Sequence, residues 1–313
     1  MQSTRFQSAL AKRFAEDLVL DGKMPRTILA YQRSVGKLAQ HYGTSPDKLT
    51  EQQVRDYLLL RRSQLATNSM RPVLCGIQAF YRLTAPREWK TLRAMRIPKH
   101  RGLPKVLVPQ RAWELIEATS ALHLRVLFRT AYTCGLRTGD VQALTIDDVD
   151  RDRMLLHVRH TKLLNERFVP LPEATLDALR SYWAAHRHPR WLFPSRESLQ
   201  SIATATEHVS ERTIQRGLKQ VIRSLGWNET GIVPHTLRHS YATTLLEQGV
   251  NLRVLQSYLG HKNLQATEVY LHLTQHGDAK GRSIVKQWMN GPVSSEDLAP
   301  EESLSTSKPE VES

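Results

Sequence analysis

The chain has few cysteines and no long apolar run. Cys75 and Cys134 are the only cysteines among its 313 residues, so a disulfide framework is excluded and a reducing cytoplasm fits. No stretch of 18 apolar residues occurs, and nothing predicts a membrane-spanning segment. The first residues mix polar and apolar types without a hydrophobic stretch, so we expect no signal peptide. These absences favour a cytoplasmic protein with no membrane partner.

Acidic residues are scarce relative to basic ones. The chain holds 44 lysines and arginines against 30 acidic residues, a net charge of +14. Residues 291–313 carry six of the acids and one lysine, so residues 1–290 hold 43 basic and 24 acidic side chains, a net charge of +19. An excess of this size, spread over the folded part, favours a polyanionic partner. Charge alone leaves open a protein that is merely basic.

Residues 1–97 are predicted to form a helical bundle. Apolar residues recur at helical spacing in 6–20, 24–42 and 69–83. Thr50 and Gln53 form a capping-box pattern that opens a helix through Leu60. This region holds no recognisable set of catalytic groups.

A linker and a second domain are predicted to follow. Residues 98–105 are rich in Pro, Gly and positive charge, which is typical of a connection between domains. Residues 106–290 form the second domain, and the acidic tail 291–313 is expected to be disordered. Strands are expected at 154–158 and 167–171, joined by a turn at 163–165. Helices are expected at 109–119, 123–133, 173–186, 211–226, 236–248, 252–259 and 276–289.

The predicted fold class is therefore mainly α with a small antiparallel β-sheet (α+β). It comprises an N-terminal helical bundle and a mixed second domain.

Five segments of the second domain carry reactive side chains. Read singly, each has an ordinary interpretation: a surface ion pair, a solvated lysine at a hairpin tip, a helix cap or a core aromatic. Together they form a set that chance rarely produces. The set is Arg137 with Asp140, Lys162, His235 with Arg238, His261, and Tyr270.

These residue types suit phosphoryl transfer. Two arginines can bracket one phosphate and stabilise the extra charge of a pentacoordinate transition state. A phenol is a poor nucleophile at its ordinary pKa, so Tyr270 needs a base, which His235 can supply. Lys162 can protonate the leaving 5′ oxygen. No HExxH motif, metal-spaced carboxylate cluster or P-loop occurs, so we expect neither a metal nor another cofactor.

The same residues resemble the tyrosine recombinase (phage integrase) family, which includes Xer recombinases, integron integrases and lambda-type integrases. Gly135-Leu136-Arg137 with Asp140 is similar to the family's first arginine motif, and Lys162 has the spacing of its β-hairpin lysine. The run from His235 to His239 matches its His-x-x-Arg box. Leu259-Gly260-His261 and Tyr270 match its final histidine and nucleophile.

The resemblance implies an activity and an assembly. It implies a SAM-like core-binding bundle followed by a catalytic domain, which together clamp double-stranded DNA. It also implies cleavage and rejoining through a 3′-phosphotyrosyl bond on Tyr270, in integration, excision, transposition or dimer resolution. The chain would be a monomer or weak dimer when free and a homo-tetramer on synapsed DNA at the nucleoid. An accessory protein could assist, and the helix at 276–289 would dock on a neighbouring copy.

Two other functions fit parts of the pattern. One is a DNA-binding regulator that kept the fold and lost strand exchange, which the intact catalytic set argues against. The other is a type IB topoisomerase, which uses similar chemistry as a monomer. The separate N-terminal bundle and the expected exchange helix favour a recombinase.

Overall fold

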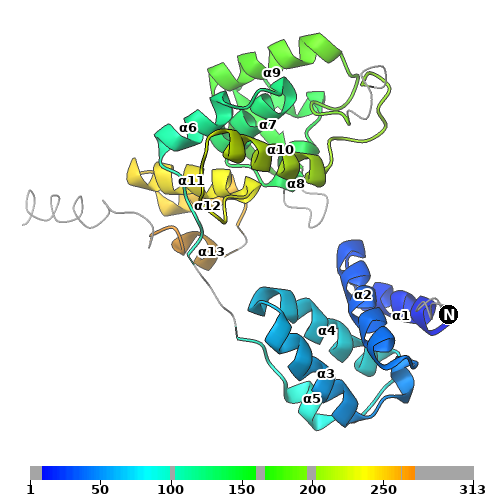
Figure 1. Cartoon of the computed structure of the whole chain (residues 1–313). Coiled ribbons are helices and arrows are strands. Elements are labelled where there is room, and N and C mark those ends of the chain that lie inside the picture. The colour runs from blue at the N-terminus through cyan, green and yellow to red at the C-terminus, as the bar shows by residue number, and fades with distance from the viewer. Residues whose placement is uncertain (1–8, 99–102, 160–165, 196–201, 262, 272–313) are drawn as a thin grey trace, which may run out of the picture. The chain divides into compact units, whose positions relative to one another are not determined.

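The computed structural model describes residues 9–98, 103–159, 166–195, 202–261 and 263–271. The chain divides into two compact units, Met1–Gly102 and Leu103–Ser313, which are described separately below (Figure 1). The limits of the predicted linker stay a prediction, since residues 99–102 lie outside the described part. The predicted turn at 163–165, the predicted helix at 276–289 and the acidic tail also lie outside the described residues, so they too stay predictions.

The N-terminal unit is a helical bundle around one apolar core. Phe14 and Phe80 meet edge to face with ring centroids 5.3 Å apart, and Val35 and Ile77 are fully buried beside them. The predicted capping box at Thr50 is present. The elements of the N-terminal unit are α1 (Ala9–Leu20), α2 (Pro25–Tyr42), the short 3-10 helix Pro46–Lys48, α3 (Glu51–Gln64), α4 (Thr67–Leu83) and α5 (Lys90–Ala94).

The C-terminal unit surrounds a second apolar core with helices and one small sheet. Phe128, Phe193 and Leu255 are among its fully buried members. Its helices are α6 (Pro109–Glu117), α7 (Leu122–Thr133), α8 (Thr138–Gln142), the 3-10 helix Ile146–Asp148, α9 (Glu173–His186), α10 (Glu211–Ser224), α11 (Pro234–Glu247), α12 (Leu252–Leu259) and α13 (Gln265–Glu268).

The sheet has three antiparallel strands in the order β1 (Val149–Asp150), β2 (Leu155–Val158) and β3 (Arg167–Pro170). Leu156 pairs with Val169, and both point into the core. Arg167 has the same inward orientation as Val169, because side chains two residues apart share a face of a strand. The predicted fold class, mainly α with a small antiparallel sheet, is confirmed.

The elements that the sequence pattern did not predict are short. They are α5, α8, α13, the two-residue strand β1 and the 3-10 helices Pro46–Lys48 and Ile146–Asp148, each too short to show a hydrophobic period. Helix α3 also runs to Gln64 rather than ending at Leu60.

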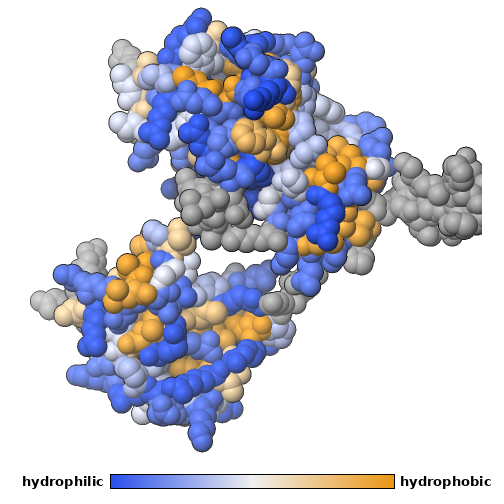
Figure 2. Space-filling model, turned by 180° about the vertical axis from the view of Figure 1, so that it is seen from behind, coloured by the Kyte–Doolittle hydropathy of each residue, from blue (hydrophilic) through white to orange (hydrophobic). Residues whose placement is uncertain are grey.

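The surface matches the charge of the chain. Figure 2 shows one face, where hydrophilic side chains cover most of both units and hydrophobic ones form smaller patches. Among the described residues, no helix has both the length and the hydropathy needed to cross a bilayer.

Candidate active site

Arg137 is placed by a tight turn between α7 and α8. Gly135 has a φ of +61°, and a Cβ there would lie 2.4 Å from the Tyr241 ring, so glycine is the one residue that fits. Arg137 then caps α8, where its backbone N–H donates to the Asp140 carboxylate at 3.3 Å. Burial lowers the pKa of Arg137, while the Asp140 charge opposes that change.

Asp140 lies between two arginines. Its Oδ2 accepts from a terminal nitrogen of Arg167 at 2.7 Å and lies 3.9 Å from one of Arg137. Burial alone would raise the pKa of Asp140, but the positive charges of Arg167 and Arg137 outweigh it and lower the pKa. Arg167 also donates through Nε to the Tyr258 carbonyl at 2.8 Å. The carboxylate of Asp140 therefore holds both arginines.

Arg238 is held inside the unit, with 1% of its surface exposed. It lies in the first half of α11 and donates to the Gly135 carbonyl at 2.8 Å, to the Leu259 carbonyl and to Nε2 of His261 at 3.1 Å. Burial, followed by the charge of Arg137, lowers its pKa to about 9. Arg238 therefore remains a cation at neutral pH.

His261 follows the end of α12. Gly260 ends that helix at a φ of +61°, and a Cβ on it would lie 2.9 Å from the Arg167 side chain. Burial, then Arg238 and Arg137, lower the pKa of His261 to about 3, so the ring is neutral at neutral pH. Since Nε2 accepts from Arg238, Nδ1 carries the hydrogen and donates to the Thr267 hydroxyl at 2.8 Å.

Tyr270 points into the same cluster, with 2% of its surface exposed. Its ring lies nearly parallel to that of His261, with centroids 6.3 Å apart. Its hydroxyl lies 2.9 Å from Nδ1 of His239. Burial raises the pKa of Tyr270 although Arg238 and Arg137 lower it, so the phenol is protonated at neutral pH.

His235 lies one turn before His239 on α11, and their ring centroids are 5.2 Å apart. Burial, then Arg238 and Arg137, lower the pKa of His235, which leaves it neutral. The hydrogen bond of the phenol goes to His239, not to His235, which was the base expected from the sequence.

The structure brings most of the predicted set together. Lys162 lies outside the described residues. Two residues of the cluster were missed: Arg167, whose inward place on a short strand is an unusual position for arginine, and His239, which has helical i, i+4 spacing from His235. The residues gathered here are Arg137, Asp140, His235, Arg238, His261 and Tyr270, with Arg167 and His239 added.

Comparison with known proteins decides the family. The phage integrase family description matches residues 105–276, which is more than half of the chain. The chain belongs to the phage integrase family. A second description, the SAM-like N-terminal domain of phage integrases, matches residues 10–91. The resemblance drawn from the motifs is thereby confirmed.

Relatives of known name match over most of their length. Tyrosine recombinase XerA of Pyrococcus furiosus is 30% identical over 278 residues, covering 88% of this chain and 93% of that protein. Tyrosine recombinase XerD of Bradyrhizobium diazoefficiens is 30% identical over 288 residues, covering 81% and 88%.

Solved structures share the fold of this phage integrase family member. A XerH recombinase bound to a palindromic difH substrate, in a post-cleavage complex, matches with a TM-score of 0.67 at 15% identity, covering 91% of this chain and 92% of that one. A lambda integrase dimer bound to a COC′ core site matches with a TM-score of 0.66 at 19% identity, covering 84% and 76%.

Proposed function

We propose that this protein is a site-specific tyrosine recombinase, which cleaves and rejoins double-stranded DNA through a 3′-phosphotyrosyl bond on Tyr270. One observation carries the proposal: the Tyr270 phenol is buried beside Arg137 and Arg238, whose positive charges partly offset the rise in its pKa that burial causes. A phenol held among guanidinium groups suits attack on a phosphodiester. Named relatives include tyrosine recombinases.

The arginines supply the phosphate site. One terminal nitrogen of Arg137 is buried and, among the described residues, has no hydrogen-bond partner. A buried donor without an acceptor is costly, and a non-bridging phosphate oxygen would provide the acceptor. Arg238 would hold the same phosphate with its remaining N–H groups. His261 would support this contact, because it accepts from Arg238 at 3.1 Å.

The remaining predicted residues complete the chemistry. Lys162 would protonate the leaving 5′ oxygen, and His235 would serve as a further proton-handling group beside the arginines. Asp140 would act by holding Arg137 and Arg167 in place. The phosphotyrosyl bond keeps the free energy of the broken phosphodiester, so ligation needs no ATP.

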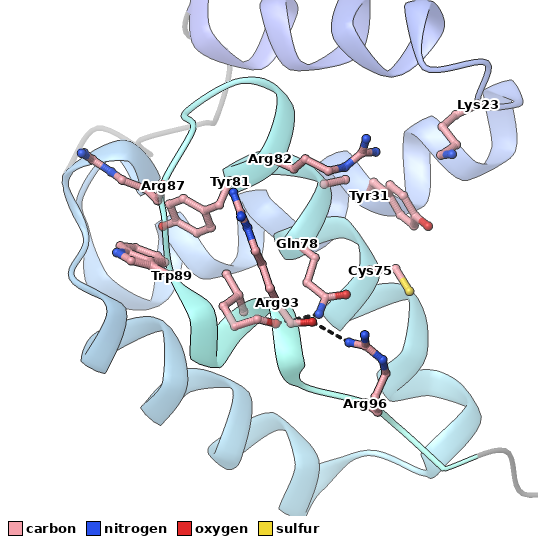
Figure 3. A pocket seen from close by; sticks show the side chains of 12 residues that line it. Lys23, Tyr31, Cys75, Gln78, Tyr81, Arg82, Arg87, Trp89, Arg93 and Arg96 are labelled. Atoms are coloured by element: carbon pink, nitrogen blue, oxygen red, sulfur yellow. Dashed lines mark hydrogen bonds between the residues drawn. The ribbon is translucent and has the colours of Figure 1, made fainter.

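The N-terminal unit offers a second basic surface for DNA. A hollow of about 550 Å³ is lined by the aromatic rings of Tyr81 and Trp89, as Figure 3 shows. Among the residues lining it, none is acidic. Lysine and arginine beside aromatic rings are typical of a surface that contacts the DNA backbone. The basic residues are Lys23, Arg82, Arg87, Arg93 and Arg96.

The active assembly is inferred from the same relatives. Proteins of this fold include one described with its difH substrate and one as a dimer on a core site. We infer that four copies of this chain act on two synapsed duplexes in the cytoplasm, at the nucleoid, in integration, excision, transposition or dimer resolution.

A nicked suicide substrate tests the proposal. The short product diffuses away after cleavage, so wild-type protein should accumulate as a covalent protein–DNA adduct that survives denaturation. Tyr270→Phe should bind the same DNA and form no adduct. Tyr182→Phe, which alters a buried tyrosine of α9, is the matched control and should still form it. An adduct with Tyr270→Phe would refute the nucleophile, and binding without any wild-type adduct would favour the regulator.

A further inference from the structure

The phenol of Tyr270 contacts His239, and it also has a hydrogen bond with Arg238. Nδ1 of His239 lies 2.9 Å from the hydroxyl oxygen, with ring centroids 5.6 Å apart. His235, on the same helix, has its ring 5.2 Å from that of His239. A candidate proton acceptor must first be within hydrogen-bond reach of the proton it removes. His239 meets this condition in the resting protein.

The protonation states fit this geometry. Tyr270 carries its proton, since burial raises its pKa, and a phenol hydroxyl donates to a neutral ring nitrogen. Burial, then the neighbouring His235 and Arg238, lower the pKa of His239 to about 4, so the ring is neutral and Nδ1 has a free electron pair. The hydrogen bond therefore runs from Tyr270 to His239, with the ring hydrogen of His239 on Nε2.

With a pKa of about 4, His239 is a weak base in the protein without DNA, and proton transfer from Tyr270 would need a stronger one. The titratable and charged groups around His239 are His235 and Arg238 on its own helix, and Tyr270 and His261 from the chain that follows. A phosphate bound by Arg238 and Arg137 would offset the positive charges that weaken His239 as a base. DNA binding would thus raise its pKa and strengthen the acceptor at the moment of attack.

We propose that His239 is a catalytic residue whose Nδ1 takes the proton from Tyr270 during attack on the DNA. This inference rests on the proposed recombinase activity. The phenol oxygen forms a bond to phosphorus, its proton moves to Nδ1, and the bond from phosphorus to the 5′ oxygen breaks. Lys162 gives that leaving oxygen a proton. On ligation the 5′ hydroxyl attacks phosphorus and gives its proton back to Lys162, the tyrosyl bond breaks, and His239 returns the proton to Tyr270.

Two substitutions of His239 distinguish its two roles, which are to accept a hydrogen bond from the phenol and to take the proton of the phenol. His239→Asn offers an amide oxygen close to the position of Nδ1, which accepts a hydrogen bond but takes no proton at neutral pH. His239→Leu removes both functions. His208→Asn, at a ring that packs on Trp191 outside the cluster, is the matched control.

Single-turnover cleavage of the nicked substrate at saturating protein gives the main readout. We expect His239→Asn to slow adduct formation at least about 10-fold near neutral pH and His239→Leu about 100-fold or more. Both losses should shrink as the pH rises toward the pKa of the phenol. DNA binding should stay within about 2-fold of wild type, as should cleavage by His208→Asn. Wild-type rates in His239→Asn would overturn the proton transfer.

A modified leaving group identifies the side of the reaction on which His239 acts. With sulfur in place of the bridging 5′ oxygen, the leaving group needs no proton. The substrate should rescue Lys162→Ala and leave the His239 variants slow. Rescue of the His239 variants would overturn the inference. If wild-type protein formed no adduct on either substrate, the proposed function itself would fail, which is a separate outcome.

Discussion

Asp140 is the counter-charge for the arginines of the cluster. Its carboxylate accepts from Arg167 at 2.7 Å, and both side chains are buried. Asp140→Ala would leave the buried Arg167 and the half-buried Arg137 without an anion, and breaking a buried ion pair such as Asp140–Arg167 costs about 3–5 kcal/mol. Urea unfolding of the full chain measures the loss.

An exposed pair provides the comparison for Asp140. Asp177 and Arg180 form an ion pair on α9 with side chains that are 61% and 56% exposed. Asp177→Ala should lower the free energy of unfolding by no more than about 1 kcal/mol. Equal losses in the two variants would mean that burial adds nothing to the Asp140 pair.

The neutral histidines make stability depend on pH. The pKa of His239 is about 4 and that of His261 about 3, whereas both rings titrate near 6.5 in the unfolded chain. Between pH 6.5 and 4 the unfolded state therefore binds more protons. The free energy of unfolding should be greatest above pH 6.5. It should decrease as the pH is lowered, by up to about 1.4 kcal/mol per pH unit for each histidine.

Unfolding in urea at several pH values checks this slope. His239→Asn removes one of the contributing histidines and should make the profile less steep between pH 6.5 and 4. A wild-type stability that is constant or rises on acidification through this range would contradict the assignment of neutral rings.

At the residue scale, motif spacing marked most of the groups in the cluster. It predicted Arg137, Asp140, Arg238, His261 and Tyr270 as one set, and the structure places them together. It did not reveal the phenol's partner. Which of two histidines on one helix face touches Tyr270 depends on where the segment after α12 packs, and that is a long-range contact.

At the scale of elements, the turn between α7 and α8 controls the cluster. Gly135→Ala would add left-handed backbone strain of about 1–2 kcal/mol and push a methyl group onto the Tyr241 ring, 2.4 Å away. Arg238 also donates to the Gly135 carbonyl. We expect a loss of more than about 3 kcal/mol in urea unfolding, together with slower adduct formation.

A comparison with Gly226 distinguishes the cost of backbone strain at Gly135 from the cost of the contact with the Tyr241 ring. Gly226 has a φ of +66° and, among the described residues, nothing within 4 Å of where a methyl group would be added, so Gly226→Ala should cost only the backbone strain. A loss for Gly135→Ala no greater than that for Gly226→Ala would remove the Tyr241 contact from the argument.

Long elements were predictable and short ones were not. The limits of α9 and α12 were predicted as observed, because each helix presents a full apolar stripe between clear start and stop residues. Helices α8 and α13 have five and four residues, too few for a period. They form because the core around them fixes their backbones, which no local pattern reports.

At the scale of the whole molecule, each unit has its own apolar core. A domain with its own core is able to fold alone. We therefore expect a fragment of residues 1–102 to unfold cooperatively in urea, as followed by circular dichroism. A gradual, non-cooperative loss of helix would contradict this expectation.

The basic hollow of the N-terminal unit predicts a salt dependence. If Arg93 and Arg96 bind phosphates, replacing both by alanine should reduce the slope of log binding constant against log salt by up to about 0.9 for each phosphate no longer neutralised. Lys12→Ala, at an exposed residue of α1 that does not line the hollow, should leave the slope unchanged. An unchanged slope in the double variant would place DNA elsewhere.

Arg238 is anchored by carbonyl oxygens of the main chain, at Gly135 and Leu259. Every residue type supplies such an oxygen, so this anchorage does not depend on which side chain position 259 carries. An apolar replacement that fills the same space in the core as Leu259 would leave the guanidinium where it is. An insertion or deletion within α12 would instead rotate the carbonyl away. Related chains should thus tolerate replacements at the exposed positions of this helix, and apolar replacements at its buried ones, far better than changes in its length.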